Sequence, residues 1–186
     1  MAPNIHKSVN RLVNVRSRLL SSPLWFRLVQ NDRERNYAGA IYGTMVSMTV
    51  VATASKDDSL GSIAIAVWAA VTGFVFWIVH VYADIVAAGY STPREALHHA
   101  RRALRVEWPI VQGAMIPALA MLTAPIGLAN DDNASYIAVG AGILMLFATG
   151  LFIGTRDRRT WGRRIMIGLV NALFGFVILA LKIFVH

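Results

Sequence analysis

Residues 60–83 read LGSIAIAVWAAVTGFVFWIVHVYA, and this stretch decides the fold. It contains no Asp, Glu, Lys or Arg, and as a helix it would extend about 36 Å at ~1.5 Å per residue. That length crosses the hydrocarbon core of a bilayer, about 30 Å thick, with some tilt. Four further apolar stretches are present, so the sequence predicts an all-α membrane protein with five transmembrane helices, at about residues 37–55, 60–83, 108–129, 134–155 and 165–185.

The basic residues are unevenly distributed between the two sides of this five-helix pattern. All but two of the 18 Lys and Arg residues fall on one side, in three blocks: residues 7–35, 94–105 and 156–164. The two exceptions are Lys56 and Lys182. Because basic loops remain in the cytoplasm, we expect a cytoplasmic N-terminus and an external C-terminus at His186, in the cell membrane. The connections at residues 56–59 and 130–133 are acidic or polar and are expected outside.

The composition agrees with a membrane protein and excludes several other classes. The 186 residues are 56% hydrophobic with a mean hydropathy of +0.52, which is more apolar surface than a soluble domain of this size can bury. The net charge of +8 comes from loops beside the spans, so we expect anionic lipids and no nucleic acid as partners. The expected headgroup contacts are Arg101, Arg102, Arg158 and Arg159. The absence of cysteine excludes disulfides and iron–sulfur clusters, and no cofactor is expected.

Two segments outside the spans have the pattern of amphipathic helices with basic faces. In the N-terminal segment, residues 1–36, apolar residues recur every three or four positions. A poorly ordered basic leader is the alternative for this segment. Between the second and third spans, Thr92, Pro93 and Glu95 form a capping box, which predicts a helix over about residues 92–105. This helix is expected to lie on the cytoplasmic surface of the membrane.

Ionisable side chains near the cytoplasmic ends of the second and third spans form the candidate polar site. His80 and Asp84 are four residues apart and share a helix face, so the carboxylate could orient the imidazole as a proton acceptor. Glu107 begins the third span at the same level. The alternative is that these side chains are hydrated and pair with the helix of the connecting loop. No metal site is expected, because the adjacent His98 and His99 point about 100° apart on a helix.

Small residues predict where the helices pack closely. Gly39 and Gly43 are four residues apart, as are Gly150 and Gly154, and each pair can form a packing face. The alternative is the ordinary enrichment of glycine in membrane helices. No nucleophile elbow, phosphate loop or HExxH motif is present. The chain is therefore not expected to be an enzyme.

Four short motifs occur in order along the spans. They are YGT at residues 42–44, FWIVHVYA at 76–83, EWP at 107–109 and LKIFVH at 181–186. In these motifs the chain resembles a group of small actinobacterial integral membrane proteins. The resemblance implies an actinobacterial cell membrane and a shared role for His80, Tyr82 and Glu107, and it implies no activity.

Two functions remain open at this point. The apolar mid-depth of the spans, the small-residue faces and the odd number of spans favour a non-catalytic accessory or assembly subunit of a larger membrane complex. A respiratory-chain assembly is one host by analogy, and the partners would be other membrane proteins or copies of the chain itself. The alternative is a homo-oligomeric proton or cation channel, in which His80, Asp84 and Glu107 form a vestibule on the cytoplasmic side.

Overall fold

A computed structural model describes residues 24–57, 59–89, 92–156 and 160–184. By its contacts the chain divides into residues 1–34 and residues 35–186, and the spans lie in the second of these units. Residues 1–23 of the predicted N-terminal amphipathic segment lie outside the described residues, as do Arg158, Arg159 and His186, whereas residues 24–36 of that segment are helical.

All regular structure in the described ranges is helical. The elements are α2 (Leu24–Ala54), α3 (Ser62–Ala88), α4 (Pro93–Val106), α5 (Pro109–Ala120), the 3₁₀ helix η1 (Met121–Thr123), α6 (Asp131–Arg156) and α7 (Trp161–Phe184). The helical stretches long and apolar enough to cross a membrane are Asn36–Ala54, Ser62–Ala88, Pro93–Thr123, Asp131–Thr155 and Trp161–Phe184. The prediction of an all-α fold with five such helices is confirmed, and the chain is a multi-pass membrane protein.

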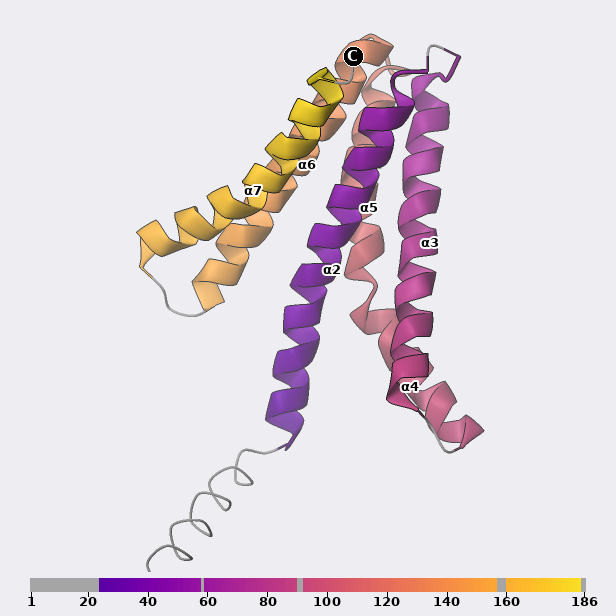
Figure 1. Cartoon of the computed structure of the whole chain (residues 1–186), viewed down its shortest axis with the longest axis vertical. Helices are drawn as coiled ribbons and strands as arrows, with labels where there is room; N and C mark the ends of the chain where they lie inside the picture. The colour runs from indigo at the N-terminus through magenta and orange to yellow at the C-terminus, as the bar shows by residue number, and fades with distance from the viewer. Residues whose placement is uncertain (1–23, 58, 90–91, 157–159, 185–186) are drawn as a thin grey trace, which may run out of the picture. The chain divides into compact units, whose positions relative to one another are not determined.

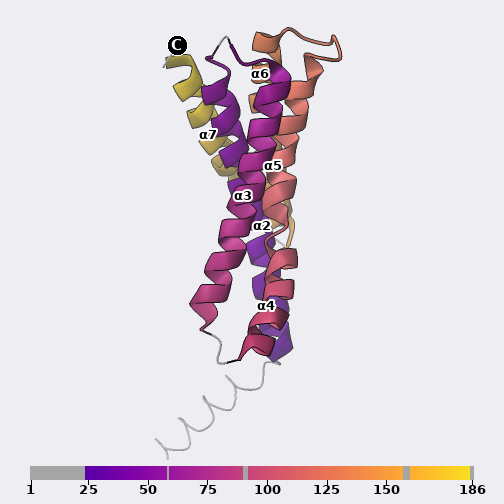
Figure 2. The same cartoon turned by 90° about the vertical axis from the view of Figure 1, so that its right-hand side faces the viewer.

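Within residues 35–186 the helices form two associated groups. α6 and α7 make an antiparallel hairpin, and α7 packs mainly against α6 (Figure 1). α3 packs along α5, and α4 lies against α3 (Figure 2). α5 joins the groups because it also contacts α6. The connections alternate between two ends: the lysine end, with Lys56 and Lys182, and the arginine end, with α4 and the start of α7 at Arg163 and Arg164.

Glycines allow the backbones of α2 and α5 to touch. A Cβ atom added at Gly43 of α2 would lie 1.9 Å from the carbonyl oxygen of Ile110 in α5. One added at Gly39 would lie 3.2 Å from the Ile110 side chain. On the facing helix, a Cβ at Gly113 would lie 2.2 Å from the carbonyl oxygen of Ala40. Because backbone atoms cannot move aside as a flexible side chain can, these glycines set the distance between the two helices.

The α6–α7 hairpin uses the second predicted glycine pair in the same way. A Cβ at Gly150 would lie 2.6 Å from the Cα of Gly168, and one at Gly154 would lie 2.8 Å from the Cα of Arg164. Both neighbours belong to α7, so the two positions lie on the face of α6 that packs in the hairpin. Small residues therefore line the contact between these helices at two levels.

The third span ends earlier than the sequence predicted. The helix stops at Thr123, whereas the predicted span continued to about Ala129. Pro125 has no N–H with which to continue the helix, and Gly127 has a φ of 78°, in the left-handed region. The N–H of Leu128 donates to the Thr123 carbonyl oxygen at 3.0 Å and closes the turn. α5 and η1 together extend only about 22 Å, so the candidate span includes residues of α4.

Replacing Gly43 by alanine is expected to lower the free energy of unfolding by about 1–3 kcal/mol, because the added methyl group meets a backbone carbonyl. Gly140→Ala is the matched control, since a Cβ there meets nothing within 4 Å. The midpoint of thermal unfolding in detergent, followed by circular dichroism, should fall for the first variant and stay constant or rise for the second. Equal midpoints for both variants and the wild type would contradict the packing at Gly43.

Candidate functional site

The ionisable residues predicted as one polar cluster have different partners. The Nδ1 atom of His80 lies 2.9 Å from the carbonyl oxygen of Phe76, one turn earlier in α3. Asp84 pairs with His99 of α4 instead, with 3.2 Å between Oδ2 and Nε2. The carboxylate of Asp84 therefore joins α3 to the helix of the connecting loop, and the His80 ring is held by its own helix.

The other two residues of the predicted cluster occupy contrasting positions. Tyr82 is 67% exposed, and at two residues from His80 it lies on another side of α3. Glu107 is only 5% exposed where α4 meets α5, and its backbone N–H donates to the Ala103 carbonyl oxygen at 2.9 Å. Among the residues that the structure describes, no group of three or more His, Cys, Asp or Glu is placed to hold a metal ion. His80 and Asp84 thus have different hydrogen-bond partners at the arginine end.

α4 folds back along the last turns of α3. The Nε1 atom of Trp77 donates to the Leu104 carbonyl oxygen at 3.2 Å, while Asp84, further along α3, reaches the earlier residue His99 of α4. The two helices therefore run antiparallel. The rings of Trp77 and Trp108 also meet edge to face, with 5.3 Å between their centroids. The helix that the sequence placed on the membrane surface is thus held against α3 by specific side chains.

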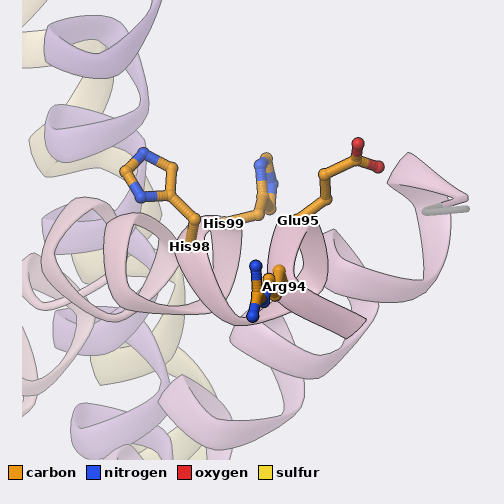
Figure 3. A pocket seen from close by; sticks show the side chains of 4 residues that line it. All are labelled: Arg94, Glu95, His98 and His99. Atoms are coloured by element: carbon orange, nitrogen blue, oxygen red, sulfur yellow. The ribbon is translucent and has the colours of Figure 1, made fainter. Parts of the chain in front are cut away.

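An open hollow of about 440 Å³ lies on the surface of α4 (Figure 3). Its lining residues are Arg94, Glu95, His98 and His99. Arg94 and Glu95 leave the helix on different sides (Figure 3), and His99 is engaged by Asp84. Because the four side chains do not converge on one point, the hollow has no evident geometry for a ligand.

Three of the four sequence motifs meet near the arginine end. Tyr42 of the first motif and His80 of the second have ring centroids 6.1 Å apart. Trp77 of the second motif contacts Trp108 of the third. The described part of the fourth motif lies at the lysine end, where it contributes Lys182. The first three motifs therefore contribute packing contacts between α2, α3 and the start of α5.

A cavity of about 170 Å³ at the lysine end was not predicted from the sequence. Its lining residues are Ser55, Lys56, Asp132, Ser135, Tyr136 and Lys182. Lys56 and Lys182 are the two basic residues outside the arginine-rich blocks, and the fold brings them together from the first loop and the last helix. Both lysines depart from the charge pattern, because they lie on the side of the spans that has few basic residues, and this departure could have predicted the site.

The ammonium group of Lys182 is buried, with the residue only 6% exposed, and it has two neutral partners. It donates a hydrogen bond to the hydroxyl oxygen of Ser135 in α6, and it lies 4.2 Å from the centroid of the Tyr136 ring. A desolvated cation–ring contact contributes about 2 kcal/mol, and a hydrogen bond to a charged group about 1.5–3 kcal/mol. Both contacts offset part of the cost of removing an ammonium ion from water.

Side-chain hydrogen bonds order the loops around this cavity. Asp131, the first residue of α6, accepts from the backbone N–H of Ser62 at 3.3 Å, which ties the start of α6 to the start of α3. In the loop between α2 and α3, the Asp57 carboxylate accepts hydrogen bonds from the hydroxyl and the N–H of Ser59, at 2.5 and 3.0 Å. These two hydrogen bonds hold the pKa of Asp57 below its usual value.

No protein-family model matches the chain, and no significant match is found among curated proteins or solved structures. The arrangement of the residues is therefore the basis for a functional proposal.

Trp77→Phe keeps an aromatic ring but removes the donor to Leu104. Because α4 then loses a contact with α3, hydrogen exchange of its backbone amides is expected to become roughly two- to tenfold faster. Trp68→Phe is the matched control, since Trp68 is 62% exposed on the same helix. If exchange in α4 were the same in Trp77→Phe as in the wild type, this contact would not be what holds α4.

Proposed function

We propose that the chain is a non-catalytic accessory or assembly subunit of a larger membrane complex. The observation that supports this most strongly is the close packing within the spans. The Ile110 carbonyl oxygen occupies the space where Gly43 would carry a Cβ, and Ala114 of α5 fills the corresponding space at Gly73 of α3, 2.3 Å from a Cβ added there. At these two positions the helices touch closely, with no gap for a solute between the paired residues.

Exposed apolar helix faces supply a surface for partner helices. Only 22% of the span in α7 and 28% of that in α3 is buried within the chain. Large side chains point outward along α7, among them Leu173 at 61% and Phe176 at 53% exposed. In a bilayer, helices associate through shape, van der Waals contact and interhelical hydrogen bonds, so these faces suit lipid and a helical partner alike.

The charge distribution supports an orientation for this subunit. Arginine-rich segments favour the cytoplasmic side, so we place the arginine end in the cytoplasm and the lysine end outside. Arg101 and Arg102 of α4 would then contact anionic headgroups, at about 1 kcal/mol for each basic residue near the surface. The motif resemblance favours an actinobacterial cell membrane, and a respiratory-chain assembly is proposed as the host by analogy alone.

A proton or cation channel has weaker support. It would use His80, Asp84 and Glu107 together, whereas Asp84 pairs with His99 and His80 bonds to the Phe76 carbonyl oxygen. A pore would have to form between copies of the chain, lined by helix faces that are apolar along most of their length.

A photo-crosslinking amino acid at Leu173, in the full chain within its native membrane, is expected to capture an unlike membrane protein in a reproducible ratio. Leu173 is suitable because it is exposed on the least buried span. The same amino acid at Leu97 of α4, 57% exposed outside the apolar part of the bundle, is the matched control for non-specific capture. Crosslinks to copies of the chain alone, or identical products at both positions, would contradict the subunit proposal.

Flux measurements on the same protein distinguish the two functions. The purified chain in liposomes is expected to pass no more protons than empty liposomes. A pH-dependent flux that Asp84→Asn or His80→Ala abolishes would establish the channel instead.

A further inference from the structure

We infer that the cavity between Lys56 and Lys182 binds one phosphate group, carried by a phospholipid or present as free phosphate. Lys182 is more than nine-tenths buried, at 6% exposed, and lines the cavity from α7. Lys56 lines it from the loop that follows α2. The fold has thus gathered basic side chains from two distant parts of the chain around one space.

Among the described residues that line the cavity, the charges leave an excess of one positive charge. Lys56 and Lys182 each contribute one positive charge, and Asp132 contributes one negative charge. Within the described part of the chain Lys182 makes no ion pair with a carboxylate, and its close partners are the Ser135 hydroxyl and the Tyr136 ring. A phosphodiester carries a single negative charge and would balance this excess.

The hydrogen-bonding groups and the size of the cavity also suit a phosphate group. Lysine binds phosphate as a point charge with three donors, and both Lys56 and Lys182 line the cavity. The cavity volume of about 170 Å³ is several times the ~30 Å³ that a water molecule occupies in the liquid.

The position of the cavity gives a lipid phosphate access to it. Lys182 lies in the last turn of the fifth candidate span, and Lys56 lies just beyond the end of the first. Both are near the level where the hydrocarbon core meets the headgroup layer, and lysine side chains extend readily across that boundary. A phosphate at this depth can reach the two lysines while its lipid chains remain in the bilayer. The site does not depend on whether the chain also binds other membrane proteins.

Native mass spectrometry of the full chain, purified in neutral detergent and depleted of lipid, tests this site. Titration with phosphatidylglycerol should show one tightly bound molecule on the wild type. Its affinity should fall about tenfold or more in Lys56→Gln, because a bond to a charged group is lost, and it should rise in Asp132→Asn, because a repelling carboxylate is removed. Arg163→Gln, an exposed residue at the arginine end, is the control and should retain the tight site.

Two further ligands identify the source of the phosphate group. Competition by inorganic phosphate would show that the site takes phosphate as such, whereas failure of both phosphate and diacylglycerol to compete would show that it takes the phosphate of a lipid. Each of these outcomes supports the inference. The inference is overturned if diacylglycerol binds as tightly as phosphatidylglycerol, or if neither phosphatidylglycerol nor inorganic phosphate binds. It is also overturned if Lys56→Gln and Asp132→Asn leave the affinity for phosphatidylglycerol unchanged. Both variants alter residues less buried than Lys182, and equal thermal midpoints would show that they fold.

Discussion

A helix inside a bilayer has no water with which to satisfy a polar group, and this constraint explains the contacts of several polar side chains in the chain. Within the spans, the Thr44 hydroxyl lies 2.8 Å from the Ala40 carbonyl oxygen and 3.2 Å from that of Gly113, so it bonds to backbone on its own helix and on α5. Lys182 is tolerated near the end of α7 because Ser135 and Tyr136 of α6 receive its ammonium group. The cavity that Lys182 lines is likewise bordered by polar side chains, at the end of the spans.

Features with a local cause were predictable from the sequence. Apolar length alone predicts the five helices, because a bilayer core requires a minimum length of apolar helix. The threonine N-cap at the start of α4 is also local, and it is confirmed: the Thr92 hydroxyl accepts from the Glu95 N–H at 3.4 Å, with Pro93 in the first turn. The end of the third span was predicted less well, because Pro125 and Gly127 stop the helix inside an apolar stretch.

The partners of the polar side chains could not be predicted, because they depend on how two helices are rotated and aligned. Helical spacing alone pairs His80 with Asp84, yet folding α4 against α3 brings His99 to Asp84. Lys182 and Ser135 are similarly far apart in sequence, and no local pattern joins them. The contact between Lys182 and Ser135 depends on how α7 packs against α6, so it can be identified from the structure but not from the sequence.

In the proposed orientation, five helices cross the membrane with the arginine end in the cytoplasm and the lysine cavity outside. Since the chain has no cysteine, single-cysteine variants report the position of each loop without interference. Ser59→Cys and Leu128→Cys place a thiol at the lysine end, and Glu95→Cys and Gly162→Cys place one at the arginine end. In intact cells, a membrane-impermeant maleimide should label the first two variants and reach the other two only after lysis. Labelling of the arginine-end variants in intact cells, with the lysine-end variants protected, would contradict the account.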